Sequence, residues 1–147
     1  ANVGDSPVYL VHDGGIELLS VTHNVISEQM AINPEMAHKI DKRFQNMLTR
    51  GMGSEAAVEA DVCEIQYFEG DILTISSDGL SDLVSPEEIL DIIKAETPPK
   101  ACQTLVDLAK ERGGHDNITV IVIKIQTEDN KGRIMGMISR IMKKIFH

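Results

Sequence analysis

Two acidic residues lie next to segments that have the composition of buried strands. Asp78 ends the apolar run of residues 71–77, and Asp116 precedes the β-branched run of residues 118–123. Such runs predict strands. A carboxylate held at the end of a stiff strand is a hard oxygen ligand for a cation. If the two strand ends converge, Asp78 and Asp116 predict a metal site rather than a nucleophile site.

The strands that must position these acids are short and are separated by turn residues. A hairpin is predicted over residues 3–20, with an Asp-Gly turn within residues 12–15. Residues 62–68 alternate between two faces, one of them wetter, and predict a further strand. The apolar run at residues 72–76 predicts the next strand, and the last strand is expected over residues 118–125.

Proline residues mark the expected helix starts, because proline suits the first helical position after a capping side chain. Ser85 and Pro86, followed by an acid at the third helical position, predict a helix that reaches about residue 95. Residues 97–112 predict another helix, which ends at Gly113.

A further helix is expected to begin at Pro34, after Asn33 as its cap. Its apolar residues Met36, Ile40 and Phe44 fall at helical spacing, so we expect them to face inward. Strands and helices do not alternate regularly along the chain. This order predicts an α+β fold with a mostly antiparallel sheet.

The length and composition predict a single domain, and the charge limits the classes of partner that it can bind. The formal net charge of −9 argues against a nucleic-acid partner and suits metal cations. Cys63 and Cys102 fit no zinc motif, so we expect two buried thiols in a reducing compartment. No secretory signal and no apolar run of about 18 residues is visible. We therefore expect a cytoplasmic protein, and a peripheral contact with the membrane surface is left open.

Four short motifs are found in the order in which they stand in a known family. They are Ala1 to Ser6, Leu48 to Gly53, Gly70 to Asp82, and Gly114 to Asn117. Together they resemble the metal-dependent protein phosphatases, the PPM or type 2C family, and its bacterial members in particular. The resemblance implies a mostly antiparallel β-sandwich flanked by helices. It covers only the C-terminal half of the family's catalytic domain.

The resemblance also implies a reaction and a set of metal ligands. Asp78 and Asp116 would coordinate one of two paired Mn²⁺ or Mg²⁺ ions, and Asp5 with Asp78 would hold a third ion. The complete site would hydrolyse phosphoserine or phosphothreonine in a phosphoprotein substrate with a metal-activated water. Asp82 is expected to be a helix or turn cap rather than a ligand.

Some parts of the family's pattern have no counterpart here. The family's N-terminal half would supply a phosphate-gripping arginine and a carboxylate that bridges two metals. The chain also begins with strand-like residues and no Met, so we expect a fragment that is inactive alone. In the family, each sheet draws strands from both halves of the sequence. We therefore expect association with the missing half or self-association.

The last residues of the chain differ from the rest. Residues 131–147 carry basic but no acidic residues, and their apolar residues recur at helical spacing. We predict two parts, with residues 1–126 as the C-terminal half of the phosphatase domain and residues 127–147 as a basic amphipathic helix. That helix either docks on the body or contacts a membrane surface or a partner through residues 131–147.

Two further classes of function stay open beside the phosphatase. The first is a non-catalytic, phosphatase-like regulatory or binding module, which keeps the fold without the chemistry. The second is a membrane- or partner-docked regulatory element that acts through the basic tail.

Overall fold

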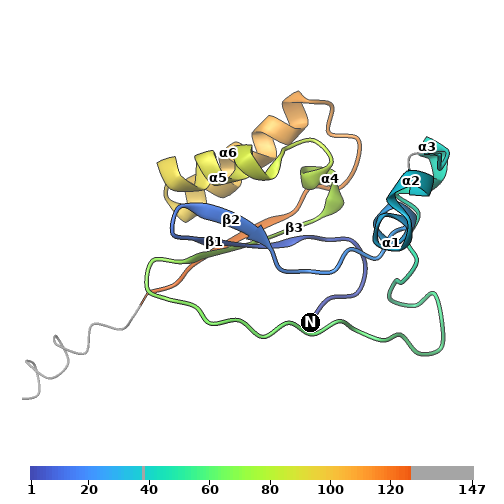
Figure 1. The fold of residues 1–147 in the computed structure, drawn as a ribbon. Helices are drawn as coiled ribbons and strands as arrows, with labels where there is room; N and C mark the ends of the chain where they lie inside the picture. Colours follow the sequence, from blue (N-terminus) through green and yellow to red (C-terminus); the bar gives the residue numbers. More distant parts are fainter. Residues whose placement is uncertain (38, 127–147) are drawn as a thin grey trace, which may run out of the picture.

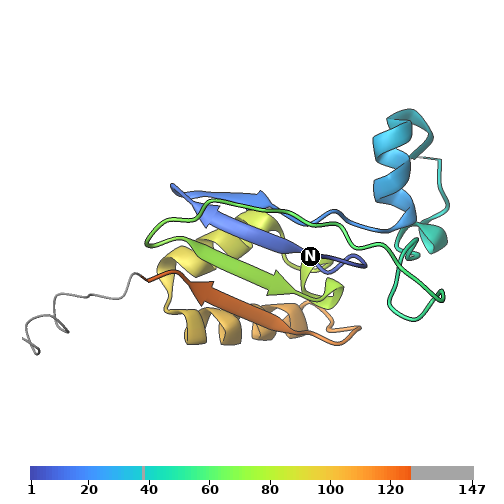
Figure 2. The ribbon, with the colours of Figure 1, turned by 90° about the horizontal axis from the view of Figure 1, so that it is seen from below.

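Four strands form a single antiparallel sheet in the computed structural model, which describes residues 1–37 and 39–126. The sheet order is β2-β1-β3-β4, as Figure 2 shows from below. The strands are β1 (Val8–His12), β2 (Gly15–Leu18), β3 (Ile72–Ser76) and β4 (Val120–Lys124). All three strand pairings are antiparallel, so the predicted α+β fold with a mostly antiparallel sheet is confirmed.

The predicted hairpin is formed by β1 and β2. Asp13 and Gly14 both have positive φ, at 46° and 80°. A two-residue hairpin loop needs positive φ at both central positions if its twist is to match that of the strands. The Asp-Gly pair therefore closes the turn and sets the register in which His12 faces Gly15.

Two long helices cover one face of the sheet, as Figure 1 shows. They are α5 (Pro86–Ala95) and α6 (Pro98–Glu111), and both begin at the proline that the sequence indicated. Ile89 of α5 and Leu105 of α6 are fully buried against Tyr9 and Val11 of β1. Burying such side chains stabilises the fold by about 1.5–3 kcal/mol each. This layer is the hydrophobic core.

The start of α5 is fixed by the predicted capping box. The Ser85 hydroxyl accepts a hydrogen bond from the Glu88 N–H, and the Glu88 carboxylate accepts one from the Ser85 N–H. Arg112, the C-cap residue of α6, then clamps the same carboxylate with two bonds of 2.6 and 2.7 Å. One glutamate therefore joins the start of α5 to the end of α6.

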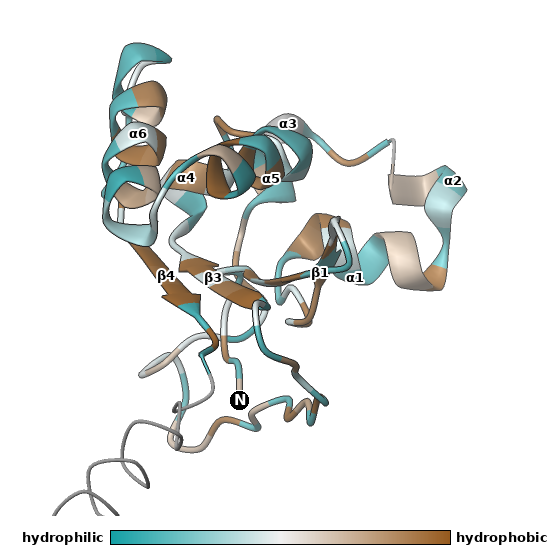
Figure 3. Cartoon of the chain, turned by 90° about the vertical axis from the view of Figure 1, so that its left-hand side faces the viewer, coloured by the Kyte–Doolittle hydropathy of each residue, from teal (hydrophilic) through white to brown (hydrophobic). Residues whose placement is uncertain are grey.

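The opposite face of the sheet has no helix over it in the described part of the chain. Ile121 and Ile123 of β4 are 48% and 43% exposed on this face. Leu73 and Ile75 of β3 lie beside them in register. We call these four residues the open face. The hydropathy colouring of Figure 3 shows β3 and β4 as strongly apolar strands.

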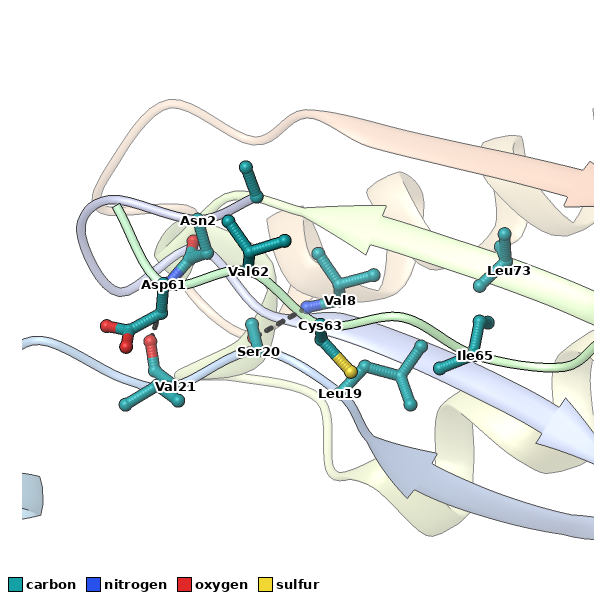
Figure 4. A pocket seen from close by; sticks show the side chains of 11 residues that line it. Asn2, Val8, Leu19, Ser20, Val21, Asp61, Val62, Cys63, Ile65 and Leu73 are labelled. Atoms are coloured by element: carbon teal, nitrogen blue, oxygen red, sulfur yellow. Dashed lines mark hydrogen bonds between the residues drawn. The ribbon is translucent and has the colours of Figure 1, made fainter. Parts of the chain in front are cut away.

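The chain returns from β2 to β3 across this open side. Both strands run antiparallel to β1, so they are parallel to each other and the connection must travel back along the sheet. An extended segment does so, and Val62, Cys63 and Ile65 line a pocket of about 250 Å³ with Leu73 (Figure 4).

The prediction of a strand over residues 62–68 is wrong. The segment is extended but joins no sheet, and its only neighbouring β-bridge in the described chain is between Asn2 and Asp61. Tyr67 and Phe68 are more than half exposed, at 62% and 57%. Ile65 is partly buried, whereas Cys63 and Tyr67 on the same side of the pattern are exposed, so the alternation does not correspond to a buried face.

The region between β2 and this return segment carries three short helices at one end of the sheet (Figure 1). They are α1 (Val25–Ile32), α2 (Pro34–Ala37) and α3 (Lys42–Gln45). We call residues 25–47 the flap. Its helix α1 was not expected from the sequence, which shows little amphipathic pattern there.

A helix begins at Pro34 as predicted, and Asn33 Oδ1 accepts hydrogen bonds from the Glu35 and Met36 N–H groups. The prediction that this helix continues to Phe44 is wrong, because α2 ends at Ala37 and a separate helix begins after Asp41, which accepts a hydrogen bond from the Arg43 N–H. Met36 and Phe44 are 47% and 46% exposed and do not face a core. Their helical spacing was accidental, because the two residues lie on different helices.

Two other expectations concern the cysteines and the tail. Cys63 is exposed and Cys102 is partly buried, so the prediction of two buried thiols is wrong for Cys63. The predicted helix over residues 127–147 lies outside the described residues, and the division after residue 126 stays a prediction. Among the described helices, none has the length and apolar character needed to cross a bilayer.

Candidate metal centre

The two predicted strand-end acids are brought together by the pairing of β3 with β4. Ser76 of β3 faces Val120 of β4 in register. Asp78 follows as the first residue of the short helix α4 (Asp78–Ser81), and Asp116 lies in the loop that leads into β4. The expected convergence of these two chain segments is therefore confirmed.

Ser77 ties the two segments to each other. Its hydroxyl donates a 2.8 Å hydrogen bond to the Asn117 carbonyl and accepts a 3.1 Å bond from the Thr119 N–H. Its own N–H donates to the Thr119 carbonyl at 3.1 Å. The residues directly after Ser77 and directly before Asn117 are Asp78 and Asp116. Sequence reasoning missed this role of Ser77, because a serine at a strand end has no special pattern.

Gly79 allows the two segments to approach closely. A Cβ atom at this position would lie 2.6 Å from the Asn117 carbonyl oxygen and 3.4 Å from the Asp116 Cβ. Any other residue here would force the loop away. Gly113 and Gly114 serve the same loop differently, because both have positive φ, at 126° and 53°.

Each acid has one oxygen engaged by the backbone. Asp78 Oδ1 accepts a 2.8 Å hydrogen bond from the Gly79 N–H, and Asp116 Oδ1 accepts a 2.6 Å bond from the Asn117 N–H. Such bonds fix the orientation of a carboxylate. Both side chains are thereby held as oriented oxygen donors next to the strand ends.

Asp5 lies in the turn before β1 and is electrostatically coupled to Asp78. Its partial burial and the neighbouring Asp78 carboxylate raise the pKa of Asp5, and hydrogen bonds from its backbone and from Asn24 oppose that rise. The preceding Gly4 has a φ of 107°, which side chains rarely tolerate. The structure thus places the third predicted ligand near the first.

Asp82 also belongs to this group of acids. Partial burial raises the pKa of Asp82, and Asp78, Asp5 and Asp116 raise it further in that order. The sequence predicted Asp82 as a cap, and it is the C-cap residue of α4. Its spacing of four residues from Asp78 could have placed it at the same site.

Asp5, Asp78, Asp82 and Asp116 form what we call the acidic cluster. Within the described residues, none of the four takes part in an ion pair with a basic side chain. Mutual repulsion of carboxylates costs stability unless a cation offsets it. The donor set therefore fits a hard divalent ion such as Mn²⁺ or Mg²⁺.

The cluster is not a complete metal site on its own. Over residues 1–37 and 39–126, no three His, Cys, Asp or Glu side chains are gathered closely enough to hold an ion. Water molecules or further ligands would have to complete the coordination. The assignment of Asp5, Asp78 and Asp116 as metal ligands stays a prediction.

Comparisons with known proteins agree with this picture of the fold. The family model described as "Protein phosphatase 2C" matches residues 36–118, which is more than half of the chain. Protein phosphatase PhpP of Streptococcus pneumoniae is 31% identical over 133 residues, which are 88% of this chain and 53% of that protein. The chain therefore belongs to the protein phosphatase 2C family.

Solved structures carry the same fold. The serine/threonine phosphatase of S. agalactiae matches with a TM-score of 0.74 at 31% identity, over 86% of this chain and 53% of that one. The catalytic domain of PstP, solved with two manganese ions, matches with a TM-score of 0.66 at 29% identity, over 85% and 52%. The chain thus spans about half the length of these relatives.

Proposed function

We propose that this chain is the metal-binding half of a protein serine/threonine phosphatase that acts on phosphoproteins. The observation that carries the proposal is the acidic cluster, whose residues Asp78 and Asp116 are brought together by the pairing of β3 with β4. The chain that carries this cluster belongs to the protein phosphatase 2C family. The manganese complex of the related PstP domain supports Mn²⁺ or Mg²⁺ as the cofactor. A cytoplasmic location is part of the same proposal.

Each acid has a role in this proposal. Asp78 and Asp116 would provide carboxylate oxygens to one of two paired ions, and Asp5 with Asp78 would hold a third. Bound ions of this kind supply an activated water and offset negative charge on phosphoryl oxygens. Ser77 and Gly79 would keep the spacing between Asp78 and Asp116 constant, since they fix the two segments against each other.

Replacement of the acids by amides tests the proposal in the complete protein. Asp78→Asn and Asp116→Asn each remove a ligand charge at nearly constant shape, so phosphopeptide hydrolysis at low Mn²⁺ should fall about 100-fold or more. Asp13→Asn is the matched control, because Asp13 is 90% exposed in the hairpin turn and should keep full activity. Normal rates for Asp78→Asn or Asp116→Asn would remove that residue from the site.

We also propose that these 147 residues alone hydrolyse little phosphopeptide. The described residues do not gather three ligands for an ion, so further groups are needed. Robust Mn²⁺-dependent turnover by the purified chain would contradict this. A complete protein that binds Mn²⁺ and a phosphopeptide without turnover would instead favour the non-catalytic module.

A further inference from the structure

A second polar cluster lies at the base of the flap, outside the acidic cluster. Its centre is His23, which is fully buried. His23 Nε2 lies 2.6 Å from Asp61 Oδ2, and Arg50 Nη1 donates a 2.8 Å bond to the same oxygen. The His23 hydrogen bond is the main cause that lowers the pKa of Asp61, so Asp61 is a carboxylate that accepts from both neighbours.

The other ring nitrogen of His23 contacts the turn that carries Asp5. The Gly4 N–H donates a 3.0 Å hydrogen bond to His23 Nδ1. Because a backbone N–H can only donate, Nδ1 must be the acceptor and Nε2 must carry the proton toward Asp61. The His23 N–H in turn donates to the Gly4 carbonyl at 3.1 Å. Gly4, directly before Asp5, is therefore held from both its N–H and its carbonyl.

The same residue joins the two ends of the flap. The His23 carbonyl accepts a 3.0 Å bond from the Thr49 N–H, and the Val25 N–H donates a 3.0 Å bond to the Met47 carbonyl. Asn24, next to His23, caps α1 by accepting a hydrogen bond from the Ser27 N–H. The start of the flap, its end and the Asp5 turn thus meet at one buried imidazole.

The His23 imidazole is buried, so we expect its hydrogen bonds to hold it in one defined orientation. A buried polar side chain without partners destabilises a fold, and here both ring nitrogens of His23 are satisfied. Such partners behind a metal ligand orient it, and their loss typically costs roughly 10–100-fold in metal affinity or activity.

We infer that His23, held by Asp61 and Arg50, is a positioning residue that fixes the Gly4–Asp5 backbone and so aims the Asp5 carboxylate into the acidic cluster. The inference rests on the proposed function, because it takes Asp5 as a metal ligand. It adds that the flap base and the metal centre share one hydrogen-bonded support, so that they are not independent parts.

Amide exchange in the 147-residue chain tests the geometric half of the inference without any activity. His23→Gln can still reach Asp61 but lacks an acceptor at Nδ1, so exchange of the Gly4 amide should accelerate roughly tenfold, the equivalent of one lost hydrogen bond. His23→Asn retains an acceptor near Gly4 and should protect this amide better than His23→Gln. His12→Gln is the matched control. His12 Nδ1 lies 2.7 Å from Asp71 Oδ1, and this pair does not involve Gly4 or Asp5.

Metal dependence in the complete protein tests the functional half. His23→Gln should raise the Mn²⁺ concentration for half-maximal activity roughly tenfold. The rate at saturating Mn²⁺ should change less than about twofold, because His23 does not touch the reacting groups. A merely structural defect would lower the saturated rate and leave the Mn²⁺ requirement unchanged, and that result would overturn the inference.

The outcomes separate this inference from the proposed function. An inactive complete protein would overturn the phosphatase, whereas unchanged Gly4 exchange in folded His23→Gln would overturn the inference alone. If His23→Gln does not fold, Asp61→Ala replaces it, since the Asp61 side chain is 40% exposed and its removal still frees the imidazole. Gly4 exchange that stays slow in Asp61→Ala would also overturn the inference.

Discussion

Ser77 and Asn117 lie 40 positions apart in the sequence, yet the Ser77 hydroxyl donates a 2.8 Å hydrogen bond to the Asn117 carbonyl. Each residue is the immediate neighbour of one strand-end acid, so this bond sets how Asp78 and Asp116 face each other. The arrangement of the two acids therefore depends on a side chain that carries no charge.

Replacement of Ser77 should loosen this junction. Ser77→Ala removes a donor to the Asn117 carbonyl and an acceptor for the Thr119 N–H, so we expect a loss of about 1–3 kcal/mol in the free energy of unfolding. Urea denaturation of the chain measures it. Ser54→Ala is the control, because Ser54 bonds only to the Gly51 carbonyl within one exposed loop. Equal effects in both variants would show that the Ser77 junction is not special.

A methyl group at Gly79 should push the two loops apart. Gly79→Ala would place its Cβ 2.6 Å from the Asn117 carbonyl oxygen, so we expect a cost of about 1–3 kcal/mol and weaker Mn²⁺ binding by the complete protein. Gly51→Ala is the matched control, since its nearest neighbour would be a comfortable 3.6 Å away. Thermal unfolding and Mn²⁺ titration measure the two effects. A Gly79→Ala protein as stable as Gly51→Ala would contradict this prediction.

Acid should weaken the link between α5 and α6. Hydrogen bonds from Arg112 lower the pKa of Glu88 from 4.5 to about 2 in the folded protein. A carboxyl with a lowered folded pKa contributes stability above its unfolded pKa and loses it as pH falls. The contribution should therefore be present above about pH 4.5 and should disappear between pH 4.5 and about 2. Comparison of urea midpoints for the natural chain and Glu88→Gln across this range isolates the effect. Parallel pH curves would contradict it.

The open face should drive association of the isolated chain. Ile121 and Ile123 are nearly half exposed on an apolar sheet surface, and large exposed apolar patches are rare in monomers. We expect light scattering to show a mass that rises with concentration. The double variant Ile121→Thr, Ile123→Thr keeps β-branched side chains in the strand and should reduce the association. A folded, monodisperse monomer at high concentration would contradict the prediction.

The sequence predicted the structure correctly where a turn, helix start or strand depends on residues only a few positions apart. The Asp13-Gly14 turn and the Ser85–Glu88 capping box form as the sequence predicts, because each depends on neighbours within a few positions. Strand β3 also agrees to the residue, since Ile72–Ser76 is an apolar run between turn residues.

Long-range contacts explain what the sequence could not reveal. The segment around Ile65 alternates like a strand but has no ladder partner among the described residues, and no local pattern reveals this. Likewise, Asp5 and Asp78 were placed together by family resemblance rather than by spacing. The hydrogen-bond partners of Ser77 and His23 could not be predicted for the same reason, because Asn117 and Asp61 lie 40 and 38 residues away from them.

The anchoring of the flap at its base has a consequence for how the sequence can change over evolution. Ala37 is the only buried apolar residue described between α1 and α3, whereas both ends of the flap are fixed through His23, Val25 and Thr49. Substitutions of exposed residues between those anchors should leave the sheet unchanged, except at Asn46, whose side chain donates a 3.3 Å hydrogen bond to Asp82 of the acidic cluster. We therefore expect the exposed surface of the flap to tolerate substitution over evolution more readily than its anchors or Asn46 do.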